Sequence, residues 1–275
     1  MKKLDANCVL FVTLDSCRYD AFTSAQAPHL KSLGPLYKAT APSHFTFGSH
    51  AAMFVGFTPG VANVAAPYVN PKFGKIFKMS GGGFSGLATP HMQLEGADIL
   101  DGHRRAGYAV LGSGAVGWFN PATATGAVLS RGFDEFFFPG NTHSLQAQVD
   151  WAYRHIELNR QKPIFLFMNI GETHVPYYYD SAPWDPDYNP CIPFGANNDR
   201  DECMRRQIAC VEFVDSRLAG LLELFSDGTT IVCADHGDCW GEDGLWEHGI
   251  GHPKVFEVPL LFRLGGRYRQ DAEVA

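Results

Sequence analysis

The sequence predicts an α/β protein in which helices cover both faces of a mostly parallel central sheet, a three-layer α/β/α sandwich. Short runs rich in Val, Ile, Leu and Phe alternate with longer stretches whose apolar residues recur every three to four positions. Such strand–helix repetition predicts right-handed crossovers between parallel strands. Strand signals resume after every loop and no internal repeat is present, which predicts a single domain over residues 1–275.

The individual elements follow from the same patterns. Five apolar runs are expected to form strands: residues 8–15, 109–116, 163–170, 229–236 and 258–263. Three amphipathic stretches are expected to form helices: residues 92–106, 144–160 and 201–225. A glycine-rich stretch and a stretch rich in Pro, Asn and aromatic residues are expected to be loops lining a cleft: residues 78–89 and 177–198.

Composition and charge restrict the partners and the compartment. The net charge of −7 excludes a global basic field for nucleic acid. No window reaches the roughly 18–20 apolar residues of a membrane helix. The seven cysteines are odd in number and show no regular CxxC pattern, which predicts reduced thiols. We therefore expect a soluble, cytoplasmic protein that binds neither nucleic acid nor a membrane; the oligomeric state is not indicated.

Polar residues follow three of the predicted strands at the same end. Asp15 ends the first strand, His174 lies just past the strand at 163–170, and Asp235 with His236 ends the strand at 229–236. Ligand and catalytic sites of open α/β sheets collect at the carboxyl ends of strands. A single Asp there is commonly a turn or cap residue, but three such positions together indicate a functional edge.

Two segments carry groups suited to metal and nucleophile chemistry. Asp235 and His236 are adjacent potential ligands, and a loop with further acids leads from them to His248; oxygen and imidazole donors suit Zn²⁺ or Mn²⁺. Thr46 precedes an expected helix start at Ser49, where backbone N–H groups favour an anionic substrate. Its hydroxyl is either a helix cap or, if a metal lowers its pKa, a nucleophile.

These segments resemble the alkaline phosphatase superfamily, and within it the sulfatase-like branch. The nucleophile block resembles the family's pattern from Thr46 to Gly56, ten residues on, and the block from Asp235 resembles a further pattern of the family. The similarity runs in order along nearly the whole chain. The matching segments are DSCRYD at 15–20, APHL at 27–30, AP at 41–42, TFGSH at 46–50, AGY at 106–108, RGFD at 131–134, ETHVPY at 172–177, ADHGDCWGEDGLWEHG at 234–249 and VPL at 258–260.

The resemblance implies a residue-by-residue site. The implied ligands of the first divalent ion, Zn²⁺ or Mn²⁺ with Ca²⁺ as a further option, are Asp15, Thr46, Asp235 and His236. Thr46 is the implied nucleophile and passes through a covalent intermediate. His248 and His174 are implied to act in catalysis or, with Glu172, to hold a second ion. The implied substrate-binding residues are Arg18, His50 and His252, with a structural ion pair to Asp20 as the alternative for Arg18.

The departures from the family pattern narrow this expectation. Sulfatases convert a Cys or Ser to formylglycine, but the matching position is Thr46, which would oxidise to a ketone, and the following Pro and Arg are replaced by Gly48 and His50. Two-metal members carry an Asp four residues before the His that matches His174, where this chain has Ile170. We therefore expect one tight metal and a second that is weak or absent. The short chain also predicts that the usual C-terminal subdomain is lacking.

The most direct functional prediction is a metal-dependent, phosphodiesterase-like hydrolase that cleaves a phosphate or phosphonate ester of a small anionic molecule through Thr46. One alternative is a sulfuryl or phosphoryl transferase, or a sulfatase-type hydrolase, on the same fold, because nothing in the sequence separates transfer to water from transfer to another acceptor. The other alternative is a non-catalytic, metal-binding partner protein.

Overall fold

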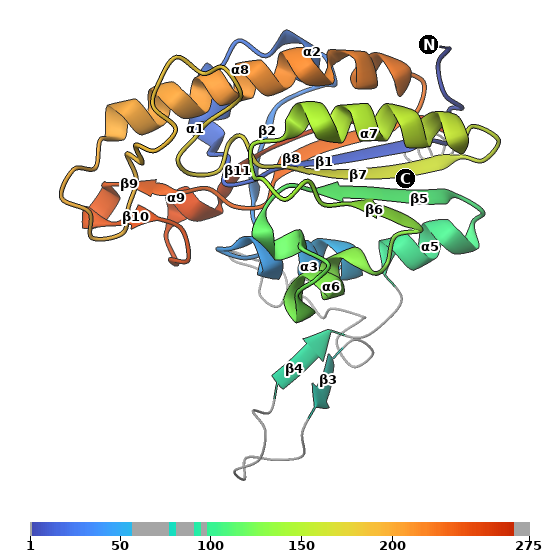
Figure 1. Ribbon diagram of the computed structural model, residues 1–275, viewed down its shortest axis with the longest axis horizontal. Helices are drawn as coiled ribbons and strands as arrows, with labels where there is room; N and C mark the ends of the chain where they lie inside the picture. Colours follow the sequence, from blue (N-terminus) through green and yellow to red (C-terminus); the bar gives the residue numbers. More distant parts are fainter. Residues whose placement is uncertain (1, 57–76, 81–90, 95–97, 267–275) are drawn as a thin grey trace, which may run out of the picture.

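A seven-stranded sheet forms the centre of the protein (Figure 1). The computed structural model describes residues 2–56, 77–80, 91–94 and 98–266. The strand order is β2–β11–β8–β1–β7–β5–β6, and β1, β5, β6, β7 and β8 run parallel while β11 is antiparallel to both of its neighbours. The strands are β1 (Val9–Leu14), β2 (Tyr37–Thr40), β5 (Ala109–Gly114), β6 (Glu135–Phe137), β7 (Ile164–Ile170), β8 (Thr229–Ala234) and β11 (Glu257–Arg263).

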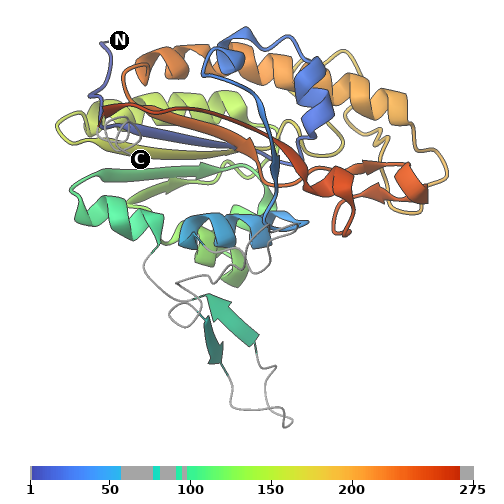
Figure 2. The same cartoon turned by 180° about the vertical axis from the view of Figure 1, so that it is seen from behind.

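Helices cover both faces of the sheet, so the expected three-layer α/β/α sandwich is confirmed (Figures 1 and 2). One face carries α1 (Tyr19–Ser24), α2 (Pro28–Lys31), α7 (Leu145–Leu158) and α8 (Arg200–Leu224); the other carries α3 (Thr46–Val55), α5 (Ile99–Arg105) and α6 (Ala124–Ser130). The short elements are β3 (Phe77–Ser80), β4 (His91–Leu94), η1 (Gly117–Phe119), β9 (Cys239–Trp240), η2 (Glu242–Gly244), β10 (Trp246–Glu247) and α9 (Pro253–Phe256).

The central strand β1 shows why the sheet is buried on both sides. Its alternate residues Leu10 and Val12 pack into the core beneath α7 and α8, and Val9 and Phe11 pack into the core beneath α3 and α5. A strand with two buried faces favours apolar residues on both, which explains why every residue of β1 except Thr13 is apolar. Its partners on both sides, β7 and β8, are paired in parallel, so three strands end at one edge.

Two sequence predictions about secondary structure need correction. A continuous helix over 92–106 is wrong, because His91–Leu94 forms strand β4 and the helix starts only at Ile99. The Asp98 side chain accepts the backbone N–H of Asp101 at 2.8 Å and caps the helix there. The strand β2 was missed, since three of its four residues are exposed at the sheet edge and give no apolar pattern.

The two predicted loops have different outcomes. Residues 78–80 of the glycine-rich stretch belong to β3, which pairs with β4, and 81–89 lie outside the described residues. The stretch 177–198 is a loop between β7 and α8, as expected. Within the described residues, no helix combines the length and apolar character needed to cross a membrane.

Candidate metal centre and nucleophile

Four polar side chains meet where β1 and β8 end and α3 begins. The last residues of β1 and β8 pair in parallel register, so Asp15 and Asp235, which follow them, leave the sheet at the same level. His236 comes directly after Asp235, and Thr46 is the first residue of α3. The carboxyl ends of parallel strands thus bring Asp15 and Asp235 together, although they lie 220 positions apart in the sequence.

The distances among these four side chains are short. Thr46 Oγ1 lies 3.4 Å from Asp15 Oδ2 and 3.3 Å from His236 Nε2. His236 Nε2 lies 3.5 Å from Asp235 Oδ2 and 3.9 Å from Asp15 Oδ1. All four residues are fully buried. Asp15, Asp235 and His236 are close enough to share one metal ion, and the Thr46 hydroxyl borders the same point.

The electrostatics of this group fit a divalent cation. Asp235 Oδ1 accepts the backbone N–H groups of Ser16 and His236, but its buried Oδ2 has no hydrogen-bond partner. Burial raises the pKa of Asp235 to about 6, and burial together with the charge of Asp235 raises the pKa of Asp15. Two buried carboxylates without a compensating charge are costly, whereas carboxylate and imidazole donors are suited to Zn²⁺. The residues present therefore fit the expected metal.

The Thr46 hydroxyl is not used as a helix cap. Helix α3 begins at Thr46, three residues earlier than expected, and its N-cap residue Phe45 makes no side-chain cap. Ser49, the expected start, instead donates its hydroxyl to the backbone oxygen of Asp235 at 2.7 Å. Thr46 therefore does not cap the helix. Its hydroxyl oxygen faces Asp15 and His236 instead.

His50 lies beneath Thr46, and its role toward a substrate stays a prediction. It is fully buried, its Nε2 lies 2.9 Å from Thr13 Oγ1, and its Nδ1 lies 2.8 Å from the backbone oxygen of Thr46. Burial lowers the pKa of His50 to about 4, so the ring is neutral near pH 7. Both nitrogens have partners inside the protein, which gives His50 the position of a support for Thr46.

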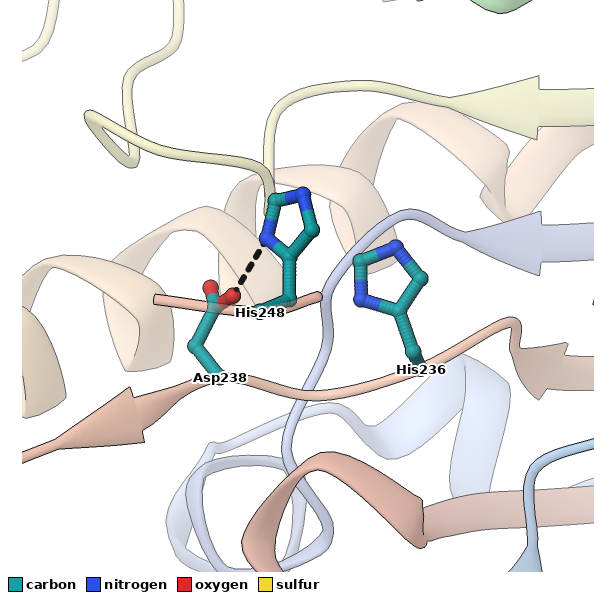
Figure 3. A group of neighbouring side chains, drawn as sticks. All are labelled: His236, Asp238 and His248. Atoms are coloured by element: carbon teal, nitrogen blue, oxygen red, sulfur yellow. Dashed lines mark hydrogen bonds and ion pairs between the residues drawn. The ribbon is translucent and has the colours of Figure 1, made fainter. Parts of the chain in front are cut away.

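A second group shares His236 with the first (Figure 3). It consists of His236, Asp238 and His248, whose potential ligand atoms lie within 4.8 Å of one another. His248 Nδ1 lies 2.8 Å from Asp238 Oδ1, and the His248 ring lies 4.4 Å from the His236 ring. The two imidazoles stand side by side, and Asp238 lies on the side of His248 away from His236.

Both carboxylate oxygens of Asp238 have hydrogen-bond partners within the protein. Tyr177 donates its hydroxyl to Asp238 Oδ2 at 2.7 Å, and the Trp240 indole N–H donates to the same Tyr177 oxygen at 2.7 Å. Burial alone would lower the pKa of His248 and raise that of Asp238. Their hydrogen bond and opposite charges outweigh burial, raising the pKa of His248 to about 9 and holding that of Asp238 below its ordinary value.

His174 and Glu172 do not complete a second metal site in the way the sequence suggested. The His174 ring lies 5.4 Å from that of His248, and its Nδ1 lies 2.8 Å from the Val175 backbone oxygen. Glu172 Oε1 accepts the backbone N–H of Leu145 at the start of α7, and burial raises its pKa to about 7. Among the described residues, neither side chain belongs to a group of potential ligands.

Arg18 is held in a structural network. Its guanidinium pairs with Asp20 at 2.6 Å and Glu242 at 2.9 Å, and it stacks on the Trp240 ring at 4.1 Å. The side chain is almost fully buried. Of the two interpretations the sequence left open, the geometry matches the ion pair.

His252 lies at the start of α9 and is not brought into either ligand group. Its Nδ1 accepts the backbone N–H of Lys254 at 3.1 Å, and its Nε2 lies 3.3 Å from Asp243. The ring therefore has a partner at each nitrogen, and its role toward a substrate stays a prediction.

Three residues at the site were not found from the sequence. Asn169, in β7, donates its Nδ2 to Asp15 Oδ2 at 3.0 Å, and Tyr177 and Asp238 form the support of His248. Asp238 lies only two residues after His236, so its acidic type was a usable signal. Tyr177 ends the matching segment at 172–177, but nothing in the sequence gave it a role. Asn169 carried no signal, because only the packing of β7 brings it to the site.

Comparison with curated proteins finds remote relatives, although no family model matches the sequence. The phosphoethanolamine transferase EptA of Salmonella typhimurium is 25% identical over 157 residues, 52% of this chain and 26% of that protein. EptA of Escherichia coli K12 is 25% identical over 126 residues, 40% of this chain and 22% of that protein. The match thus spans about a quarter of each relative's length.

Solved structures share the fold over nearly the whole chain. The C-terminal periplasmic domain of EptC from Escherichia coli, in complex with Zn, has a TM-score of 0.63 at 13% identity, covering 97% of this chain and 75% of that one. The corresponding domain from Campylobacter jejuni has a TM-score of 0.61 at 13% identity, covering 95% and 82%. An alkaline phosphatase superfamily protein from Vibrio parahaemolyticus has a TM-score of 0.55 at 16% identity, covering 96% and 61%.

These comparisons overturn one expectation and leave another unconfirmed. The cytoplasmic location is wrong, since neighbours that share the fold are periplasmic domains and one is an integral membrane protein. All seven cysteines are free and buried, and buried thiols are shielded in any compartment, so cysteine usage did not report the location. The relatives are enzymes of phosphate-ester chemistry, but as transferases, so the hydrolase class is not confirmed.

The resemblance expected from the sequence motifs is thereby confirmed in the tertiary structure: this chain has the fold of the alkaline phosphatase superfamily.

Proposed function

We propose that this chain is a metal-dependent phosphotransferase domain that moves a substituted phosphoryl group from a phosphodiester to a hydroxyl acceptor through Thr46. The observation that carries the proposal is the Thr46 hydroxyl, which lies 3.4 Å from Asp15 and 3.3 Å from His236 beside the unpartnered Oδ2 of Asp235. The relatives named phosphoethanolamine transferase favour transfer over hydrolysis. Because periplasmic domains share the fold, we place the reaction outside the cytoplasm.

Asp15, Asp235 and His236 would hold one divalent ion together with Thr46. The donor set of two carboxylates, one imidazole and one hydroxyl suits zinc, which a neighbour with this fold contains. When bound, the ion supplies a lowered pKa for the Thr46 hydroxyl and positive charge for the phosphoryl oxygens. Asn169 holds Asp15 in place through its 3.0 Å hydrogen bond, and His50 fixes the backbone of Thr46.

The covalent steps balance without a further reactant. The Thr46 oxygen loses its proton and bonds to phosphorus, while the bond from phosphorus to the leaving oxygen breaks and that oxygen takes up a proton. An acceptor hydroxyl then attacks phosphorus, the bond to Thr46 breaks, and Thr46 regains a proton. We assign His248, held by Asp238, the hydrogen bond to the leaving and entering oxygens, with His174 beside it.

We propose one tight metal rather than two. The first group has an unpartnered carboxylate oxygen, whereas the carboxylate of the second group is already satisfied by His248 and Tyr177. A metal in the second group would have to displace the proton that His248 shares with Asp238. Activity that saturates at one equivalent of zinc supports this arrangement, and two fully bound ions would overturn it.

The test uses 4-nitrophenyl phosphoethanolamine as donor and glycerol as acceptor, with the zinc-loaded full chain. We expect nitrophenolate release, a phosphoethanolamine adduct on Thr46 in acid-quenched samples by mass spectrometry, and glycerophosphoethanolamine as product. Thr46→Ala should lose all three, whereas Thr40→Ala, at an exposed position on β2, should keep them.

Other outcomes separate the alternatives. Free phosphoethanolamine as the sole product would indicate a hydrolase, and turnover of 4-nitrophenyl sulfate alone would indicate a sulfatase. No release with any divalent metal would indicate a non-catalytic binding protein. Release that continues in Thr46→Ala would remove Thr46 as the nucleophile and contradict the proposal.

A further inference from the structure

Gln207 is a fully buried polar side chain on α8 that makes three hydrogen bonds to the backbone of two loops. Its Nε2 donates to the backbone oxygen of Ser16 at 2.9 Å and to that of Thr173 at 3.0 Å. Its Oε1 accepts the backbone N–H of Arg18 at 3.0 Å. Because two carbonyl oxygens need donors and one N–H needs an acceptor, only this orientation of the amide matches all three groups.

The two loops that Gln207 joins carry residues of the candidate site. The loop after β1 begins with Asp15, and the loop after the neighbouring strand β7 contains Thr173 and His174. Thr173 adds a direct link between the loops, since its hydroxyl donates to the backbone oxygen of Asp15 at 2.7 Å. Gln207 and Thr173 thus tie the ends of two parallel strands to each other and to α8.

Ser16 has a backbone conformation that few residues other than glycine adopt. Its φ of 58° lies in the left-handed region, which costs free energy for a residue with a Cβ atom. In this conformation the Ser16 N–H donates to Asp235 Oδ1 at 3.1 Å, while its carbonyl accepts from Gln207. The left-handed turn therefore supplies a donor to one oxygen of Asp235, whose other oxygen, Oδ2, is the one without a partner.

We propose that Gln207 is a positioning residue of the metal centre, which holds Ser16 in its left-handed conformation and thereby keeps Asp235 oriented. The inference rests on the proposed role of Asp235 as a metal ligand. Without the amide, the buried carbonyl of Ser16 loses its donor, and the turn relaxes in a way that moves its N–H away from Asp235. Loss of a hydrogen bond that orients a ligating side chain typically weakens metal binding by about 10–100-fold.

The experiment measures the zinc affinity of the full chain by competition with a chromogenic chelator, a readout that does not depend on turnover. Gln207→Met keeps the length of the side chain but lacks the amide, and we expect it to bind zinc about 10–100-fold more weakly than the parent. Asp215→Leu is the matched control. Asp215 is buried on the same helix, and its Oδ1 accepts the backbone N–H of Leu30 in α2, which carries none of the proposed ligands. This control should lose stability and keep the parent's zinc affinity.

A second substitution separates positioning from a general loss of packing. Glycine adopts the left-handed region without the cost that the serine side chain incurs, so a glycine at this position does not need the hydrogen bond from Gln207. Ser16→Gly in the Gln207→Met background should regain most of the lost zinc affinity, and Ser16→Gly alone should bind zinc as tightly as the parent. If Gln207→Met does not fold, Gln207→Asn takes its place, because its amide is one methylene too short to reach both oxygens.

Parent-like zinc affinity in the Gln207 variant would overturn the proposal. A weakened affinity that Ser16→Gly does not restore, or that Asp215→Leu shares, would overturn it as well. The proposed function can fail separately: a parent that binds zinc tightly but turns over no phosphodiester contradicts the transfer reaction, while the affinities of the variants still decide the role of Gln207. A parent that binds no zinc would contradict both proposals.

Discussion

The two groups that share His236 differ in how their carboxylates are neutralised. Asp235 in the first group has a buried oxygen with no partner and a pKa raised to about 6. Asp238 in the second group is equally buried, but it is paired with His248 and Tyr177, and its pKa is lowered. The two aspartates are three positions apart in the chain, yet their surroundings shift their pKa values in opposite directions.

The two groups lie at the same edge of the sheet, and this difference indicates that they have different roles. A buried carboxylate must find a positive charge or several hydrogen-bond donors. In the first group, donors reach Asp15 and Asp235 Oδ1, but Asp235 Oδ2 has no partner, which fits the proposed external cation next to Thr46. The second group contains its own cation, protonated His248, and is arranged to hold that ring against the site.

The largest expected effect falls on Thr46, the proposed nucleophile, which borders the first group. Thr46→Ala should lower phosphodiester turnover by about three orders of magnitude or more, because no other hydroxyl is placed between Asp15 and His236 in the described residues. Its thermal unfolding midpoint should change little, since the hydroxyl does not cap α3. Thr46→Ser should retain measurable turnover. A fully active Thr46→Ala would show that the hydroxyl beside the first group is not the nucleophile.

The matched substitutions Asp235→Asn and Asp238→Asn test the comparison directly. Both remove one charge without changing shape. Asp235→Asn should lose about one equivalent of bound divalent metal in elemental analysis, because it removes a ligand of the first group. Asp238→Asn should keep that metal and lose turnover instead, as His248 loses its partner. Equal metal loss in both variants would show that the two groups form a single metal site.

The pH dependence of stability in the metal-free protein sharpens the same contrast. The folded-state pKa of Asp235 is raised from 3.8 to about 6, so the ionised carboxylate destabilises the fold above pH 6, and this cost disappears as the pH falls toward 4. Metal-free Asp235→Asn should therefore be more stable than the parent at pH 7 by about 2–3 kcal/mol, with the gap closing by pH 4. Urea unfolding in EDTA measures it; a constant gap across that range would contradict a raised pKa.

Zinc should reverse that order at pH 7, since only the parent retains the full ligand set and gains stability from bound metal. His50 and His236, whose pKa values are lowered to about 4 by burial, oppose the effect of Asp235 as the pH falls, because a buried neutral imidazole destabilises the fold when the unfolded chain takes up a proton. Both rings are present in parent and variant, so the difference between the two proteins isolates the carboxylate.

The smallest expected effect concerns the support of the second group. Tyr177→Phe removes the hydroxyl that donates to Asp238 and accepts from Trp240. We expect a loss of about 1–3 kcal/mol in unfolding free energy, because two buried polar groups lose a partner. Turnover should fall by roughly tenfold or less, with bound metal unchanged. A variant that loses its metal would show that Tyr177 supports the first group instead.

Much of the fold was determined locally in the sequence. The run at 8–15 is apolar at nearly every position, which only a strand buried on both faces requires, and β1 is that strand. The prediction of a helix over 92–106 was wrong because the apolar spacing continues across Asp98. That spacing does not reveal that the Asp98 side chain caps a helix that starts after it. The edge strand β2 was not predicted because an exposed strand has no apolar alternation to detect.

The sequence by itself also predicted that Asp15, Asp235 and His236 would meet, since residues that end neighbouring parallel strands must lie at one edge. Only the tertiary structure decided what surrounds them. Which carboxylate is left unpartnered and which is matched by His248 depend on contacts such as Tyr177 to Asp238 and Asn169 to Asp15. Those contacts join segments more than 60 residues apart, and their geometry is set by packing, which no local pattern encodes.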